Sequence, residues 1–162
     1  MATLRRGIAF VGAGLVHADP VAGPLAERCR ARLAGNGLRE LDRFFNLLID
    51  AAVEASGGSA RPDQANTAAK YRAIAAPERV SRDDHRRLLA LGRTRACLFY
   101  CEGVVRRADR RGGTTMTAGW PDARGRLRVL RLGDELRPDA GDLSSVAGFY
   151  RRLADRIASP PS

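Results

Sequence analysis

Lysine is almost absent from this chain of 162 residues: Lys70 is the single lysine among 28 lysine and arginine residues. Aspartate and glutamate together number 18, so the formal net charge is +10 and arginine carries it. A guanidinium group binds oxyanions through paired hydrogen bonds and does not lose its charge. The excess therefore has two interpretations: a surface that binds a polyanion such as nucleic acid, or the arginine, alanine and glycine usage of a GC-rich genome.

Cysteine and long hydrophobic runs are also scarce. The three cysteines, Cys29, Cys97 and Cys101, are odd in number and lack the spacing of a disulfide framework, which predicts reduced thiols in a cytoplasmic protein. We expect Cys97 and Cys101 to be buried structural residues. Neither histidine lies at a spacing that would complete four zinc ligands with Cys97 and Cys101, so no metal or cofactor is predicted. No segment has the length and apolarity of a membrane span.

Residues 1–36 form a lead rich in glycine, alanine and proline, which we expect to be loosely ordered around one short helix, Pro24 to Leu33. Residues 1–18 have the outline of a short signal peptide. Glycines interrupt its apolar run and His17 falls within the cleavage site, so export stays the alternative to a cytoplasmic location.

The remaining chain has the length of one domain, which we place at residues 37–158, followed by a disordered tail at 159–162. Apolar residues recur at steps of three and four from Leu38 to Ser56, which is typical of a helix packed on a core. A second helix is expected from Pro62 to Ala76, because proline is tolerated at the first helical position and Pro77 would end the helix.

The longest helix is expected at about 81–110. Ser81 and Asp84 match a capping box at its start, and two glycines follow Arg110. Apolar side chains from Ala96 to Val105 point in nearly every direction around this helix, so its middle should be surrounded by protein. The predicted fold is therefore mainly α, a single-domain helical bundle around one long central helix.

A period of two over about 114–132 predicts a β-hairpin with strands at 115–120 and 126–132. Alternation in the second strand predicts an apolar face with Leu127 and Val129, and a basic face. Such a basic hairpin after helices resembles the wing of winged-helix DNA-binding domains, whose arginines contact phosphate. The candidate nucleic-acid-binding residues are Arg124, Arg126, Arg128 and Arg131. A C-terminal amphipathic helix, capped by Asp142, completes the fold.

Glu102 is the one charged residue within the apolar stretch of the predicted central helix. A buried carboxylate is costly unless it is paired, and Arg95 and Arg106 share its helical face. We therefore expect a buried ion pair of Glu102 with these two arginines. The alternative is a catalytic site in which Glu102 acts as a general base.

Arg79 and His85, separated by five residues, form the one pattern that resembles a catalytic motif. The spacing resembles the arginine-x4-6-histidine motif of HEPN domains, helical bundles many of which are metal-independent ribonucleases when dimeric. The resemblance implies that Arg79 stabilises a phosphate and that His85 performs acid–base chemistry. It covers seven residues, and Val80 stands where that motif usually has a polar residue.

No P-loop, zinc pattern, serine elbow or catalytic carboxylate pair occurs in the chain. The sequence thus favours a non-enzymatic binding or regulatory protein with DNA or RNA as its partner, folded alone or as a small oligomer such as a homodimer. The alternatives are a HEPN-like ribonuclease and a protein–protein interaction module with no nucleic-acid role.

Overall fold

The computed structural model describes residues 24–58, 66–74 and 81–158, with side chains from Cys29 onward. Of the expected lead over 1–36, residues 1–23 lie outside these ranges, as does the tail at 159–162. The described elements are α2 (Pro24–Ala55), α3 (Thr67–Ile74), α4 (Arg82–Tyr100), β1 (Thr115–Pro121), β2 (Leu127–Arg131) and α5 (Ala140–Ala158). The predicted fold class is confirmed: the chain is mainly helical with one antiparallel hairpin.

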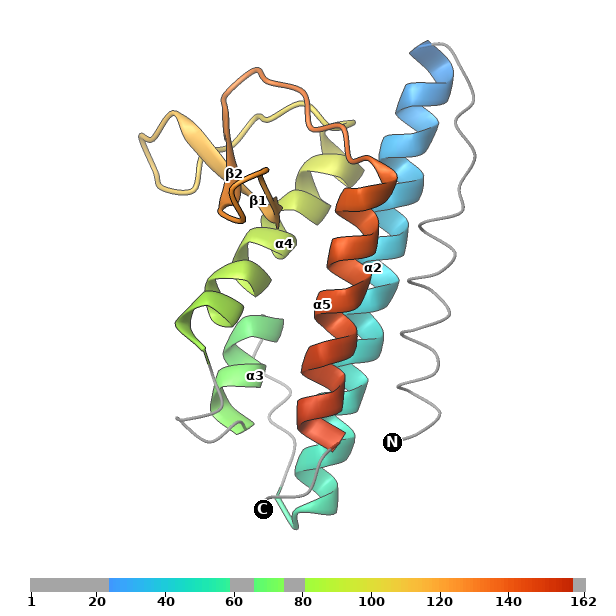
Figure 1. The fold of residues 1–162 in the computed structure, drawn as a ribbon, viewed down its shortest axis with the longest axis vertical. Helices are drawn as coiled ribbons and strands as arrows, with labels where there is room; N and C mark the ends of the chain where they lie inside the picture. Colours follow the sequence, from blue (N-terminus) through green and yellow to red (C-terminus); the bar gives the residue numbers. More distant parts are fainter. Residues whose placement is uncertain (1–23, 59–65, 75–80, 159–162) are drawn as a thin grey trace.

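Helices α2 and α5 lie side by side and run in the same direction, while α4 runs back the opposite way (Figure 1). Helix α3 packs between α2 and the beginning of α4. The hairpin contacts the bundle mainly through β1, which lies against α4 and α5. No described helix has the length and apolarity needed to cross a membrane.

The longest described helix is α2, which corrects the prediction of a short helix at 24–33 and a separate one from Leu38. The glycines of Gly35-Asn36-Gly37 do not interrupt it. A β-carbon on Gly35 would lie 3.1 Å from the Phe99 backbone nitrogen and 3.3 Å from the Leu98 β-carbon, so glycine here lets α2 approach α4 closely. This tertiary packing offsets the low helix propensity of glycine.

Helix α4 begins where the sequence predicts, because the Ser81 hydroxyl accepts a hydrogen bond from the Asp83 backbone N–H. It ends at Tyr100, ten residues before the predicted end. Glu102 takes a left-handed backbone conformation with a φ of 53°, and the Gly103 N–H donates to the Cys97 carbonyl. The chain then leaves the helix, so Val104 and Val105 belong to an extended segment.

The hairpin is present, but its faces differ from the prediction. Inward packing belongs to β1, where Met116, Ala118 and Trp120 are buried. Val129 on β2 is 60% exposed, so the expectation that it faces the core is wrong. Because the hairpin packs on the helices mainly through β1, the residues of β2 are half-buried or exposed, and their alternation does not mark a face that points into the core.

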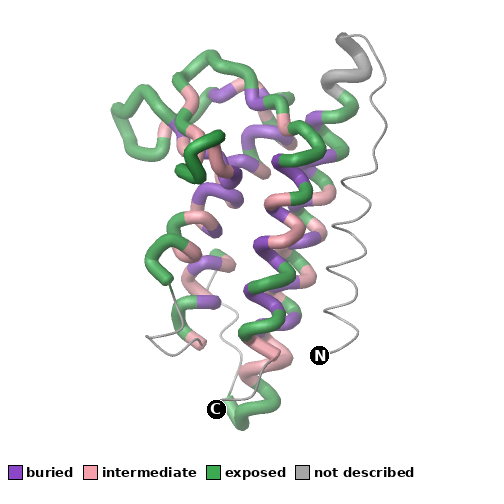
Figure 2. The backbone as a smooth tube through the Cα atoms, in the orientation of Figure 1, coloured by how far each residue is buried: buried purple, intermediate pink, exposed green. Residues whose placement is uncertain are grey.

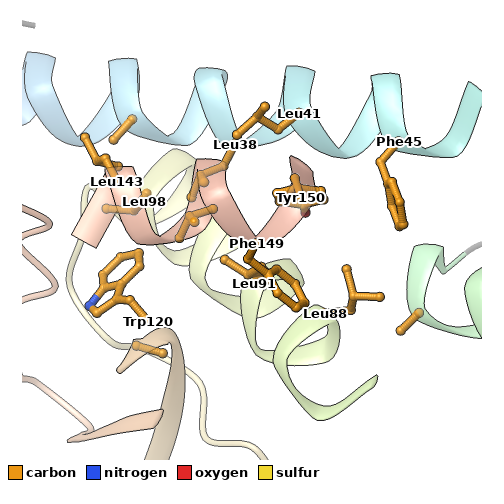
Figure 3. Packing of buried hydrophobic residues seen from close by; sticks show 14 of the residues in the cluster. Leu38, Leu41, Phe45, Leu88, Leu91, Leu98, Trp120, Leu143, Phe149 and Tyr150 are labelled. Atoms are coloured by element: carbon orange, nitrogen blue, oxygen red, sulfur yellow. The ribbon is translucent and has the colours of Figure 1, made fainter. Parts of the chain in front are cut away.

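The core fills the space between α2, α4, α5 and β1 (Figure 3). Its side chains come from all four elements and include Leu38, Leu41, Phe45, Leu88, Leu91, Leu98, Trp120, Leu143, Phe149 and Tyr150. Buried residues follow the inward faces of the helices in Figure 2. Burial of apolar surface is the main force that holds such a bundle together.

Side chains that precede α3 and α5 cap these two helices. Helix α3 spans Thr67–Ile74, while Pro62, its predicted start, lies outside the described residues. The Asn66 side-chain oxygen accepts from the Ala68 N–H at 2.8 Å. Helix α5 begins at Ala140, and Asp139 rather than Asp142 precedes it. The Asp139 carboxylate accepts from the Asp142 N–H at 2.7 Å, and the Asp142 carboxylate accepts from the Asp139 N–H at 3.2 Å. This reciprocal pair is the arrangement of a capping box.

Candidate functional site

The segment that follows α4 has the closest grouping of arginines in the described chain, four in six residues. We call residues 106–111, Arg-Arg-Ala-Asp-Arg-Arg, the basic loop. All four of its arginines are exposed, and the loop lies in a largely exposed stretch of the chain (Figure 2). Within the described residues, none of the four forms an ion pair. The four members are Arg106, Arg107, Arg110 and Arg111.

The one acidic residue of the basic loop is turned toward the protein. Asp109 pairs with Arg93 of α4 at 2.7 Å and accepts hydrogen bonds from the Thr117 backbone N–H at 3.0 and 3.1 Å. The Asp109 carboxylate is thus already committed to α4 and β1. It leaves the charge of the four arginines uncompensated within the loop.

Backbone hydrogen bonds fix the chain just before the basic loop and within it. Before it, the Val105 N–H donates to the Asp134 carbonyl at 2.9 Å, and the Gly133 N–H donates back to the Val105 carbonyl at 2.9 Å. Within it, the Asp109 N–H donates to the Thr115 carbonyl at 2.8 Å. A surface fixed in this way loses less conformational entropy when it binds a partner.

The hairpin arginines that the sequence singles out are in a different environment. Arg128 pairs with Asp142 at 3.2 Å, and the Asp142 side chain is only 7% exposed. Arg126 lies 3.9 Å from Asp122, whose carboxylate also accepts from the backbone N–H groups of Arg124 and Arg126. These backbone hydrogen bonds, that from Arg126 first, lower the pKa of Asp122.

Arg128, which is predicted from the sequence to lie on the basic face, therefore has a structural role in the fold. Its guanidinium joins β2 to the first turn of α5 through Asp142. Burial raises the pKa of Asp142, while the nearby Arg128 charge lowers it. Arg124 and Arg131 are exposed and form no ion pair with any described residue.

Arg87 contributes to the positive charge of the chain, but its guanidinium is also used for contacts within the fold. Arg87 donates to the Gly119 carbonyl at 2.9 Å and to the Ser145 hydroxyl at 2.9 Å, and its guanidinium lies 4.5 Å from the centre of the Phe149 ring. It thus ties α4 to β1 and α5. Burial lowers the pKa of Arg87.

The predicted buried ion pair of Glu102 with Arg95 and Arg106 is wrong. The Glu102 side chain is 42% exposed and pairs with Arg32 of α2 at 3.3 Å. Arg95 pairs instead with Asp42. The i,i+4 relation between Glu102 and Arg106 requires a helix, and α4 ends before either residue. Exposure of Glu102 also removes the basis for the general-base alternative.

Arg79 lies outside the described residues, so its relation to His85 is not defined. His85 lies in the first turn of α4 and is half-buried, with its Nδ1 atom 3.3 Å from the Ala68 carbonyl oxygen of α3. This contact places one ring nitrogen against the protein backbone.

The three cysteines are free and differ in burial. Cys97 is buried, Cys101 is half-buried and Cys29 is exposed. Of the pair Cys97 and Cys101, for which buried thiols are expected, only Cys97 is fully buried. Burial raises the pKa of Cys97 to about 11, which keeps it protonated and weakly nucleophilic at neutral pH. Among the described residues, no group of three or more histidine, cysteine or acidic side chains is placed to hold a metal ion.

Sequence reasoning missed the basic loop as a site because it assigned Arg106 to Arg110 to the end of a helix. The signal that could have found it is the composition itself, four arginines and one aspartate in six residues. Comparison of the chain with protein-family models, curated proteins and solved structures found no match.

Proposed function

We propose that this protein binds nucleic acid, and that the basic loop is the principal contact with the phosphate backbone. The observation that supports the proposal is the set of four exposed arginines in residues 106–111 that form no ion pair with described residues. Unpaired guanidinium groups bind phosphate without first breaking an internal ion pair, and the fork geometry suits phosphate oxygens.

The surroundings of the basic loop support the same interpretation. Asp109 is held by Arg93 and Thr117, so the acid of the loop does not compete for its arginines. The hairpin lies at the same end of the bundle as the basic loop (Figure 1). Its Arg124 and Arg131 are exposed and add positive charge there. Phosphate contacts of this kind fix position and orientation, and they give affinity without sequence preference.

A salt titration tests the proposal. Fluorescence anisotropy of labelled DNA and RNA, single-stranded and double-stranded, is measured with the full chain from about 50 mM salt upward. We expect binding at about 50 mM salt and a linear fall of log K with log salt concentration, with a slope of roughly −3 to −4 if the four loop arginines each contact one phosphate. Absence of binding to every nucleic acid at about 50 mM salt would contradict the proposal and favour a protein–protein interaction module.

A further inference from the structure

A groove of about 930 Å³ runs beside α4, from the start of α3 to the basic loop. Thr67 and Ala68 line one end, and Arg106 and Arg107 line the other. The volume lies near the upper end of the range of roughly 300–1,000 Å³ that is usual for ligand sites. The lining also includes Asp42, Arg93 and Arg95. Arg95 pairs with Asp42 and Arg93 pairs with Asp109, so Arg106 and Arg107 are the lining arginines without an ion pair to a described residue.

Small residues of α4 keep the middle of this groove open. A β-carbon added to Gly92 would meet no atom within 4 Å, and Ala96 is exposed. On another face of α4, Gly35 of α2 packs closely against Leu98 and Phe99. The prediction that protein surrounds the middle of this helix is therefore wrong on the groove side, where no described element covers Gly92 and Ala96.

Tyr100 lines the groove beside the arginines and presents an aromatic ring to solvent. It is 79% exposed, more than any other exposed large hydrophobic residue in the described part of the chain. Its ring packs edge to face on Phe99, with the centroids 4.9 Å apart, and the Arg39 guanidinium lies 5.4 Å from the Phe99 centroid. Tyr100 is thus held by its neighbour rather than buried by it.

An exposed aromatic ring beside unpaired arginines in an open groove is the arrangement that binds single-stranded nucleic acid, because bases stack on the ring and phosphates bind the cations. We infer that the groove beside α4 binds single-stranded nucleic acid, with a base stacked on Tyr100 and phosphates bound by Arg106 and Arg107. Bases within a duplex are stacked on one another and cannot reach Tyr100 without being flipped out. This inference rests on the proposed function and adds to it a stacking contact that only single strands can make.

The first test compares Tyr100→Ala with Tyr100→Phe. Both are titrated with a labelled single-stranded oligonucleotide of about 12 nucleotides and with a duplex of the same length. Loss of one stacked base should weaken single-strand binding by Tyr100→Ala roughly 5- to 150-fold, while Tyr100→Phe keeps its affinity within about twofold. Duplex binding should be the same for both variants, and the high exposure of Tyr100 means that both should fold.

A second variant tests the groove independently of the aromatic ring. Gly92→Leu places a side chain in space that no described atom occupies, and Gly92→Ala is the matched control. We expect Gly92→Leu to weaken single-strand binding at least about fivefold, with duplex binding unchanged, if one stacked base is displaced.

The outcomes separate the inference from the proposed function. If the unmodified protein binds neither single strands nor duplex, the proposed function itself is contradicted. If it binds both, and Tyr100→Ala keeps full single-strand affinity or loses affinity for both equally, the groove inference is overturned while the basic loop stands.

Discussion

The hairpin and the basic loop each carry four arginines, but their charges are available to a partner to very different degrees. On the hairpin, Asp122 and Asp142 lie beside Arg126 and Arg128, and Asp142 is buried. In the basic loop, Asp109 is turned to Arg93, so no described carboxylate pairs with the loop arginines. The comparison teaches that the number of arginines in a segment does not measure its capacity to bind phosphate.

The largest expected effect belongs to the basic loop. Replacing Arg106, Arg107, Arg110 and Arg111 together with Gln should weaken nucleic-acid binding roughly 10³-fold or more at about 50 mM salt, because four phosphate contacts are lost. The free energy of unfolding should change little, since these side chains are exposed and unpaired within the described chain. Fluorescence anisotropy measures the affinity and urea denaturation measures the free energy of unfolding. An unchanged affinity would show that the basic loop is no more available to phosphate than the hairpin.

The hairpin should show the opposite pattern at Arg128. Arg128→Gln leaves the Asp142 carboxylate buried without its partner, so we expect a loss of about 1–3 kcal/mol in the free energy of unfolding. The nucleic-acid affinity of the folded variant should fall by no more than the contribution of one phosphate contact. Urea denaturation tests this, with Arg124→Gln as the matched control on an exposed, unpaired hairpin arginine. A stable Arg128→Gln with much weaker binding would place Arg128 in the interface.

The pH dependence of stability sharpens the same point. Because burial raises the pKa of Asp142 above its ordinary value of 3.8, the folded protein takes up this proton at a higher pH than the unfolded chain. Protonation of Asp142 therefore favours the folded state, and its contribution to stability is lost as pH rises through the raised pKa. Relative to Asp142→Asn, the unmodified protein should gain stability as pH falls from neutral toward 3.8. A shift in the opposite direction would mean that attraction to Arg128 outweighs burial.

The smallest effect is expected at the tip of the hairpin. Arg124→Gln removes an exposed guanidinium that has no described ion pair, so the free energy of unfolding should stay within about 0.5 kcal/mol. The slope of log K against log salt should lose at most about one unit. A larger loss of slope would move the main phosphate contact from the basic loop to the hairpin.

Local signals predicted much of the fold. The Ser81 cap, the hairpin and the amphipathic helix that contains Leu143 and Tyr150 all depend on residues close in sequence, and all three are present. The sequence did not predict that α2 continues through Gly35. The reason for a glycine there is its close contact with α4, which is distant in sequence.

The candidate site could not be predicted in the same way. The apolar residues Val104 and Val105 continue a helical pattern, but backbone pairing with residues 133–135 places them in an extended segment. That pairing carries the chain out of α4 and sets the basic loop on the surface. Spacing along the sequence does not encode such a pairing, so Glu102 and Arg106 were assigned a helical relation that the chain does not have.

Nuclear magnetic resonance of the arginine side chains tests the central claim most directly. The Nε–Hε signals of all arginines are followed as a single-stranded oligonucleotide is added at about 50 mM salt, where phosphate contacts are strong. Our account predicts that the largest shifts belong to Arg106, Arg107, Arg110 and Arg111, with small shifts at Arg128 and Arg87. Shifts concentrated on the hairpin, or spread evenly over every exposed arginine, would contradict the assignment of the basic loop as the phosphate-binding surface.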